Sequence, residues 1–126
     1  LTRELRPYMA DWSGYPEESL QMTSIYGVRR YSRGSKLRMH VDTLVTHVVS
    51  AIINVDQEDV NEDWPLEIKG HDGQYAYVMM EPGEMLFYES AKCLHGRPKA
   101  FQGHSYANVF MHFKPTNRGD WEYDWY

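Results

Sequence analysis

A nearly continuous run of β-branched and apolar residues, Thr46–Val55 (THVVSAIINV), constrains the fold of this chain more than any other stretch. Val and Ile are enriched in strands, and an apolar run without polar alternation is typical of a strand that is buried on both faces. Shorter runs of strand-favouring residues surround it, and turns that contain Gly or Pro separate them. The sequence therefore predicts a β-rich protein that contains one buried strand.

One amphipathic helix is expected ahead of the strands. Apolar side chains recur in residues 1–13 at spacings of three and four, which favours a helix with one apolar face. Pro7 falls inside this stretch, and Gly14-Tyr15-Pro16 ends it. The members of the expected apolar face are Leu1, Leu5, Tyr8, Met9 and Trp12.

Turn signals divide the rest of the chain into short strands. Asp72-Gly73 is a strong hairpin signal, and residues 32–35 and 81–84 indicate two further turns. Residues 56–63 are expected to form an acidic, solvated loop, and residues 97–103 a second loop. We expect strands at residues 21–31, 37–42, 46–55, 65–69, 75–80, 85–88 and 104–113, with the aromatic tail 117–126 packed on the domain.

This order of elements predicts an antiparallel sandwich or jelly roll. The expected fold class is mainly β, a jelly roll with the N-terminal helix packed outside it. The chain has 126 residues, the size of one domain. We therefore expect residues 1–126 to form a single domain, with the helix at about 1–13 and the barrel at about 21–115. Such a barrel can hold a ligand at one open end.

Composition excludes several classes of protein. The formal net charge of −5 argues against non-specific binding of nucleic acid. No apolar run approaches the roughly 20 residues of a membrane span. The single Cys93 excludes an internal disulfide and a multi-cysteine zinc site, and it slightly favours the cytoplasm. The chain starts at Leu1, so an upstream targeting segment is left open, as are the compartment and the oligomeric state.

A histidine and a carboxylate, His40 and Asp42, are two residues apart on an expected strand, so their side chains would point to the same face. With six His and 18 acidic residues in the chain, about one His-x-Asp or His-x-Glu is expected by chance. His95 lies far downstream, at the end of a late strand that can neighbour an early one in a rolled sheet. Two imidazoles and one carboxylate form the facial triad of non-haem Fe(II) oxygenases, which leaves positions open for O2 and a co-substrate.

The order of motifs between Gln21 and Pro115 is also informative. A Tyr-rich strand leads through a Gly turn to His40-Val41-Asp42, and a buried strand and a hairpin follow. Next come Glu81–Tyr88 (EPGEMLFY), His95-Gly96 and a final strand. In this order the chain resembles the prolyl 4-hydroxylase-like branch of the 2-oxoglutarate and Fe(II)-dependent dioxygenases. The Pro-Gly-Glu-x-Leu-Phe stretch ahead of His-Gly is the more specific part of the resemblance.

The resemblance implies a double-stranded β-helix, which is the same kind of fold as the jelly roll expected from the strand pattern. It implies that His40, Asp42 and His95 hold Fe(II), and that 2-oxoglutarate and O2 bind there, with ascorbate as an optional reductant. The family couples decarboxylation of 2-oxoglutarate, which yields succinate and CO2, to hydroxylation of a substrate C–H bond. The implied substrate is a prolyl or other residue of a peptide or protein, with a small molecule as the alternative.

One position departs from the family pattern. The family usually places Lys or Arg nine or ten residues after the second histidine, where it binds the distal carboxylate of 2-oxoglutarate, but His104 and Ser105 occupy those positions here. Arg29 is the first replacement that we consider, because strand alternation puts it on the face of Tyr31, which matches a tyrosine of the family's co-substrate pocket. His104 with Ser105 is the second replacement, and Arg97 is the third.

Further residues have weaker assignments. Asn108 and Phe110 share a face with His104 if the last strand is regular, so they are expected to line the pocket, and His112 would share that face near an exposed strand end. His47 is interpreted as structural. The remaining interpretations are a solvated hairpin residue for His71, a small buried thiol for Cys93, and either a substrate loop or an ordinary surface loop around Trp64-Pro65.

Two other classes of function stay open at this point. One is a non-catalytic jelly-roll binding module, cupin-like or lectin-like, with a vestigial metal site, which the missing last-strand cation favours. The other is an oxygenase on the same scaffold that uses another metal, another oxo acid or a small-molecule substrate. Fold alone does not choose among them.

Overall fold

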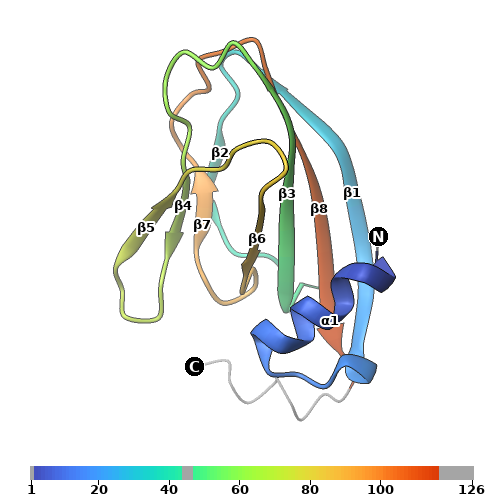
Figure 1. Ribbon diagram of the computed structural model, residues 1–126. Helices are drawn as coiled ribbons and strands as arrows, with labels where there is room; N and C mark the ends of the chain where they lie inside the picture. Colours follow the sequence, from blue (N-terminus) through green and yellow to red (C-terminus); the bar gives the residue numbers. More distant parts are fainter. Residues whose placement is uncertain (1, 44–46, 117–126) are drawn as a thin grey trace.

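The computed structural model describes residues 2–43 and 47–116. Within these residues the chain forms helix α1 (Thr2–Ser13), a short 3-10 helix η1 (Glu17–Ser19), and two four-stranded sheets (Figure 1). The strands are β1 (Leu20–Ser32), β2 (Leu37–His40), β3 (Val49–Glu58), β4 (Leu66–Lys69), β5 (Tyr75–Val78), β6 (Met85–Tyr88), β7 (His95–Arg97) and β8 (Ser105–Pro115).

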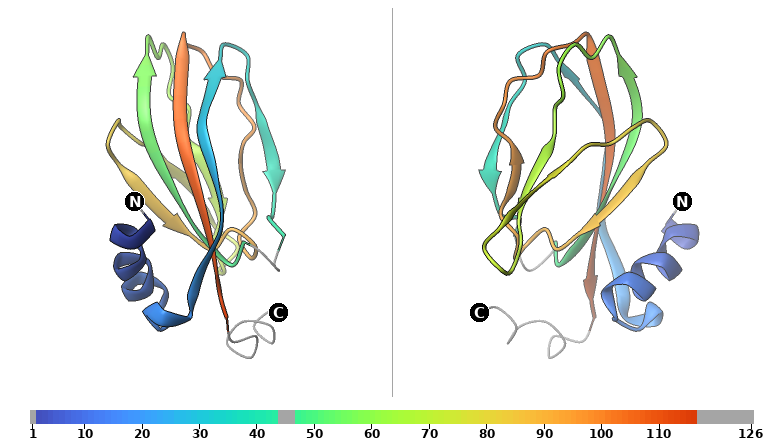
Figure 2. Two further views of the ribbon diagram at one scale, coloured as in Figure 1. Left: turned by 90° about the vertical axis from the view of Figure 1, so that its right-hand side faces the viewer. Right: turned by 60° about the vertical axis from the view of Figure 1, so that its left-hand side comes forward.

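The two sheets have the orders β1-β8-β3-β6 and β2-β7-β4-β5, and every strand pair is antiparallel. Figure 2 shows the two sheets as opposed layers, with α1 outside them. The predicted fold, a mainly-β jelly roll of the double-stranded β-helix type with an external N-terminal helix, is therefore confirmed. No helix in the described part of the chain is long and apolar enough to cross a lipid bilayer.

The central strand β3 runs further than the sequence predicts. Its first residues are buried, as the apolar run indicates, and they pair with β8 from Val49 opposite Phe113 onward. After an irregularity between Asn54 and Asp56, the pairing with β8 continues to Glu58. The acidic loop predicted to begin at Asp56 therefore begins after Glu58, because backbone pairing with a long partner strand overrides the polar composition.

The hairpin predicted at Asp72-Gly73 is confirmed. Strands β4 and β5 pair from Leu66 opposite Val78 to Lys69 opposite Tyr75. Gly73 has a φ of +81°, a conformation that residues with a Cβ rarely adopt, and its N–H donates to the carbonyl of Gly70. The turn thus returns the chain beside itself at the outer edge of the second sheet.

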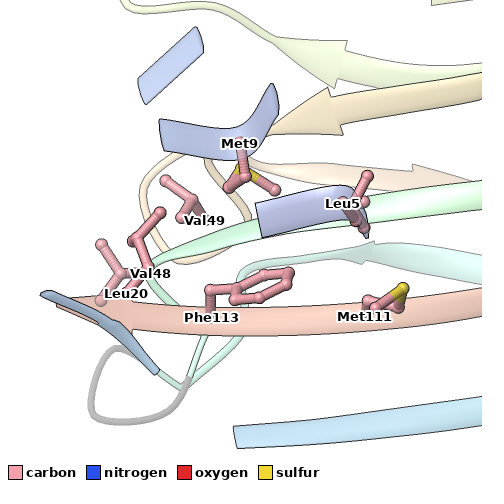
Figure 3. Close-up of a cluster of buried hydrophobic side chains, with 8 residues drawn as sticks. Leu5, Met9, Leu20, Val48, Val49, Met111 and Phe113 are labelled. Carbon is pink, nitrogen blue, oxygen red and sulfur yellow. The ribbon is translucent and has the colours of Figure 1, made fainter. Parts of the chain in front are cut away.

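Helix α1 covers the outer face of the first sheet. Leu5 and Met9 are buried against Val49 of β3 and against Met111 and Phe113 of β8 (Figure 3). The helical spacing therefore identified the packed face, but it also included Tyr8 and Trp12, which are 67% and 46% exposed. Of the predicted elements, Leu1, Thr46 and the tail 117–126 lie outside the described residues.

A second core contains side chains from both sheets and from the loops that join them. One cluster gathers around Trp64 and Phe101, and another around Ile52 and Tyr88. Trp64, which the sequence assigns to a substrate loop or an ordinary surface loop, is instead buried, and its indole N–H donates to the carbonyl of Lys99 at 2.6 Å. This second core forms one wall of the cavity described below.

Candidate metal centre

The strand pair β2–β7 brings two distant histidines together. His40 is the last residue of β2 and His95 is the first residue of β7, and the two lie opposite each other in the antiparallel register. A Cβ on Gly96 would lie 2.7 Å from the carbonyl oxygens of Leu37 and Arg38. Because backbone atoms cannot move aside as a flexible side chain can, glycine at position 96 is required for the strands to approach this closely.

Asp42 completes the group just beyond the end of β2. Its backbone N–H donates to the carbonyl of Ser90 at 2.9 Å, which holds the chain after the strand has ended. The Oδ1 atom of Asp42 lies 3.3 Å from Nε2 of His40 and 3.8 Å from Nε2 of His95. One ligand atom from each of the three residues falls within 4.8 Å of the others, so the three can hold one metal ion.

Hydrogen bonds orient both imidazoles for metal binding. Nδ1 of His40 lies 2.8 Å from the carbonyl oxygen of Arg38, and Nδ1 of His95 lies 2.8 Å from that of Cys93. A carbonyl can only accept, so each Nδ1 carries the proton and each Nε2 keeps its lone pair. Histidines that bind metals characteristically donate their other N–H in this way. The donor set, two imidazoles and a carboxylate, fits Fe(II) and other divalent first-row ions.

Burial adjusts the protonation of the group. His95 is buried, and this desolvation lowers its pKa, although the hydrogen bond to the Cys93 carbonyl and the charge of Asp42 oppose the shift. His95 is therefore neutral near pH 7, which is the form that binds a metal. His40 is partly exposed, so the ion that these residues would hold is accessible from one side.

The three residues line a cavity of about 400 Å³ between the sheets. Aromatic and aliphatic side chains form much of its wall, and both Arg29 and Arg97 also line it. Among the described residues of the lining, Asp42 is the only acidic one. The cavity therefore combines a metal-ligand group with an excess of positive charge.

Arg97 supplies the buried part of that charge. It follows His95 by two residues on β7, so both side chains point to the same face of the strand. Its guanidinium lies 4.7 Å from the ring of Trp64 and 4.9 Å from that of Tyr106, and Nη1 donates to the Trp64 carbonyl. The residue is only 1% exposed, and its Nη2 has no hydrogen-bond partner within the described residues.

Tyr31 and Arg29 occupy the same cavity at different depths. Tyr31 is buried, and its hydroxyl makes no close hydrogen bond within the described chain. Burial raises its pKa, and the charge and weaker hydrogen bonding of Arg29 and the charge of Arg97 oppose the shift. Arg29 is exposed, and its guanidinium lies 6.0 Å from the ring of Tyr26. Arg29 and Tyr31 thus share one cavity, as strand alternation predicts, but Arg29 is exposed whereas Tyr31 is buried.

Three residues predicted to bind the co-substrate do not line the cavity. His104 is 70% exposed, with its Nε2 3.6 Å from a Glu58 carboxylate oxygen, because β8 begins only at Ser105 and strand alternation does not extend to His104. The Ser105 hydroxyl accepts a hydrogen bond from Arg30 at 3.1 Å. Asn108 is buried and accepts from Asn54 at 2.9 Å. His104, Ser105 and Asn108 thus lie outside the lining of this cavity, whereas Phe110 is part of it.

Two further histidines, His47 and His112, line the cavity. His47 was interpreted as structural, and His112 was expected near an exposed strand end, but His112 is 4% exposed. Alternation on β8, which places His112 on the face of Phe110, is the signal that pointed to it. Their rings lie 4.0 Å apart between centroids, and with Asp42 they form a second group of ligand atoms within 4.8 Å.

A chain of buried hydroxyls sets the tautomer of His112. Ser90 donates to the His47 carbonyl at 2.8 Å, so its single proton is used there. Ser50, 2.5 Å from Ser90, must then donate to Ser90, and must accept from Nδ1 of His112 at 2.6 Å. The lone pair of His112 is therefore on Nε2. Burial, reinforced by the neighbouring His47 and His95, lowers the pKa of His112 to about 3, so the ring is neutral.

Comparison with known proteins supports the fold. No protein-family model and no curated protein matches the chain. Among solved structures, a Pseudomonas putida prolyl-4-hydroxylase superposes with a TM-score of 0.59 at 21% identity, over 71% of this chain and 50% of that one. A cupin domain from Bordetella pertussis matches at 10% identity, over 76% of this chain and 94% of that one, with a TM-score of 0.43. This chain thus spans about half of the hydroxylase, and the likeness shows that the two share a fold.

Proposed function

We propose that this protein is an Fe(II)- and 2-oxoglutarate-dependent dioxygenase that hydroxylates a substrate C–H bond, with release of succinate and CO2. The observation that carries the proposal is the group formed by His40, Asp42 and His95. Both imidazoles carry their proton on Nδ1, which leaves the Nε2 lone pair for a metal, and the group borders a cavity with room for further ligands. This is the arrangement that non-haem Fe(II) oxygenases use.

The charge of the cavity favours a dicarboxylate as the co-substrate. A divalent ion and Arg97 together carry more positive charge than Asp42 neutralises. A buried guanidinium without a counter-ion is costly, and Nη2 of Arg97 lacks a partner within the described chain. A dicarboxylate that reached the ion with one end and Arg97 with the other would offset both charges. We therefore assign the distal carboxylate to Arg97, ahead of the exposed Arg29.

Tyr31 fits the same assignment. Its hydroxyl is buried, has no partner within the described residues and lines the same cavity as Arg97. A neutral phenol can donate one hydrogen bond to a carboxylate, and the raised pKa keeps it protonated. Arg97 with Tyr31 would thus take the place of the last-strand cation that is missing at positions 104 and 105.

The chain's own residues have distinct tasks under this proposal. His40, Asp42 and His95 hold the metal, which when bound supplies the oxygen chemistry with O2, and with ascorbate as an optional reductant. The aromatic wall around Tyr88 and Phe110 limits the access of water. The partly exposed side near His40 and Arg29 is where a substrate would enter. We propose a prolyl or other residue of a peptide or protein as the substrate.

Anaerobic spectroscopy tests the proposal directly. Adding Fe(II) and then 2-oxoglutarate to the metal-free protein without O2 should produce a visible metal-to-ligand charge-transfer band. Admitting O2 should then discharge the band and yield succinate. The variant His95→Ala is the control and should give no band. If the parent protein gives no band and no succinate at saturating 2-oxoglutarate, the proposed function is wrong.

A second candidate is a metal-binding jelly-roll module without catalysis. The observation that favours it is the last strand, where His104 points to solvent and the Ser105 hydroxyl is engaged with Arg30. The same experiment separates the two candidates. A binding module would take up a divalent ion but would produce no charge-transfer band and no succinate, whereas an oxygenase specific for another oxo acid would respond to that acid instead.

A further inference from the structure

Three potential metal ligands lie together outside the cavity. They are His71 in the β4–β5 turn, and Glu89 and Cys93 in the segment that joins β6 to β7. One ligand atom from each residue falls within 4.8 Å of the others, and Nε2 of His71 lies 2.5 Å from a carboxylate oxygen of Glu89. The cavity lining includes none of the three residues.

A backbone turn places the side chains of Glu89 and Cys93 on the same side of the segment between β6 and β7. The N–H of Cys93 donates to the carbonyl of Glu89 at 2.9 Å, which is the bond of a single α-helical turn. Residues four apart in such a turn have neighbouring side chains. The sequence Glu89-Ser-Ala-Lys-Cys93 therefore presents a carboxylate and a thiol together.

Strand pairing brings His71 to the same place. In the β4–β7 pair, Glu67 lies opposite Gly96 and Ile68 opposite His95. The N–H of Lys69 continues this contact by donating to the carbonyl of Leu94 at 2.8 Å. The hairpin turn that begins at Gly70 therefore lies beside Cys93. Main-chain hydrogen bonds thus hold the hairpin turn beside the segment that contains Glu89 and Cys93. This proximity does not depend on the conformation of a flexible side chain.

The ligand chemistry suits a borderline-soft divalent ion. Imidazole, thiolate and carboxylate are the three side-chain ligands that Zn2+ accepts. The ionised forms of Glu89 and Cys93 would together neutralise the two positive charges of the ion. In the cavity, by contrast, Asp42 alone cannot neutralise a divalent ion. His71 is 66% exposed and Glu89 is 33% exposed, so an ion can reach the group from solvent.

From this geometry we propose that His71, Glu89 and Cys93 form a second divalent-metal site, with a preference for Zn2+, separate from the group at His40. Three protein ligands leave the fourth tetrahedral position to water or to an incoming group. This site does not depend on the proposed oxygenase function.

The second site would also support the first one. The same segment supplies the Ser90 carbonyl that accepts from Asp42, and the Cys93 carbonyl that accepts from Nδ1 of His95. An ion bound to Glu89 and Cys93 would therefore stiffen the loop that holds two of the three residues of the candidate metal centre. Addition of Zn2+ should raise the melting temperature of the parent protein more than that of Cys93→Ser.

Cobalt substitution tests the site through a signal that only sulfur ligands give. Metal-free, reduced protein is titrated with Co(II), and absorption and the number of bound ions are recorded. The parent should develop a thiolate-to-Co(II) charge-transfer band in the near ultraviolet, and Zn2+ should bleach it. Cys93→Ser should lose the band. His40→Ala, whose imidazole bonds the carbonyl of Arg38 and not the 89–93 segment, should keep it.

Two variants and a matched control identify the other ligands. His71→Ala and Glu89→Gln should each weaken the Co(II) affinity that the band reports. The loss should exceed about 10- to 100-fold, which is the cost of removing a residue that only hydrogen-bonds to a ligand. His104→Ala is the control, because His104 also pairs with a carboxylate on the surface, Glu58. This variant should keep both the charge-transfer band and the parental Co(II) affinity. A parent protein that binds Co(II) without the band, or His71 and Glu89 variants with parental affinity, would overturn the proposal. Absence of 2-oxoglutarate turnover would not affect it.

Discussion

His40 and His95 lie directly opposite each other across the β2–β7 pair, with their ring centroids 4.5 Å apart. In the sequence they are separated by 54 residues. The register of the two strands nevertheless brings their imidazoles together where β2 ends and β7 begins. Asp42 then needs only to remain beside the end of β2, which its hydrogen bond to Ser90 ensures. The geometry of the candidate metal centre is therefore mainly a consequence of strand pairing.

Gly96→Ala should disrupt this pairing. The added Cβ would lie 2.7 Å from two carbonyl oxygens of β2, so the strands must separate and the two imidazoles must move apart. We expect loss of the ion held at His40, Asp42 and His95, measured as one fewer Co(II) ion bound, together with a lower free energy of unfolding, measured by urea denaturation. Gly70→Ala is the control, because its Cβ would lie 3.1 Å from Oδ1 of the movable Asp72 side chain and at an ordinary contact distance of 3.6 Å from the Gln74 carbonyl oxygen. Equal metal affinity in Gly96→Ala and the parent would contradict this account.

His95→Ala should abolish iron-dependent turnover of 2-oxoglutarate while leaving the fold intact. The variant removes one of three ligands, but no strand-pairing hydrogen bond depends on the imidazole. Succinate formation measures activity, and circular dichroism checks the fold. His104→Ala, an exposed histidine outside the cavity, is the matched control and should retain turnover. Turnover of His95→Ala at the parental rate would show that the ligand assignment is wrong.

Arg97→Gln should weaken the binding of 2-oxoglutarate by about 1.5–3 kcal/mol, the scale of a hydrogen bond to a charged group. Arg97→Lys should recover only part of the loss, because a lysine ammonium lacks the planar fork of the guanidinium. The measurement is the 2-oxoglutarate dependence of the charge-transfer band, with the melting temperature of each variant as a check on folding. Arg29→Gln and His104→Ala should bind nearly as the parent does. A larger loss in Arg29→Gln than in Arg97→Gln would restore Arg29 as the anchor.

The stability of the protein should fall as the pH drops below about 6.5, because the folded state holds His112 neutral. The pKa of His112 is lowered from 6.5 to about 3, so below pH 6.5 the unfolded chain takes up a proton that the folded chain does not. The contribution of neutral His112 to the free energy of unfolding is therefore fully present above pH 6.5 and is lost progressively as the pH approaches 3. The lowered pKa of His95 acts in the same direction.

Each such histidine contributes a slope of at most about 1.4 kcal/mol per pH unit. Urea unfolding between about pH 7 and about pH 5 measures the slope. His112→Asn, whose amide can still donate to Ser50, should reduce the slope. An unchanged slope in His112→Asn would mean that His112 is protonated in the folded protein.

The amino-acid sequence determined the class of fold and most of its elements, because these depend on local patterns. The apolar run 46–55, the Asp72-Gly73 turn and the spacing of Leu5 and Met9 each predict an element that the structure contains. Where a neighbouring strand overrides the local pattern, as at Asp56–Glu58, sequence reasoning placed the boundary wrongly. His40, Asp42 and His95 could be singled out by residue type and motif order.

Tertiary structure decided which candidate residues share the cavity and how deeply each is buried. Alternation along a strand can state that Arg29 and Tyr31 share a face, but it cannot state that Arg97 is sealed between Trp64 and Tyr106 while Arg29 meets solvent. The hydroxyl chain from His112 to Ser90, and the meeting of His71 with Glu89 and Cys93, join segments that are distant along the chain. Such contacts depend on the register between strands, which no local pattern encodes.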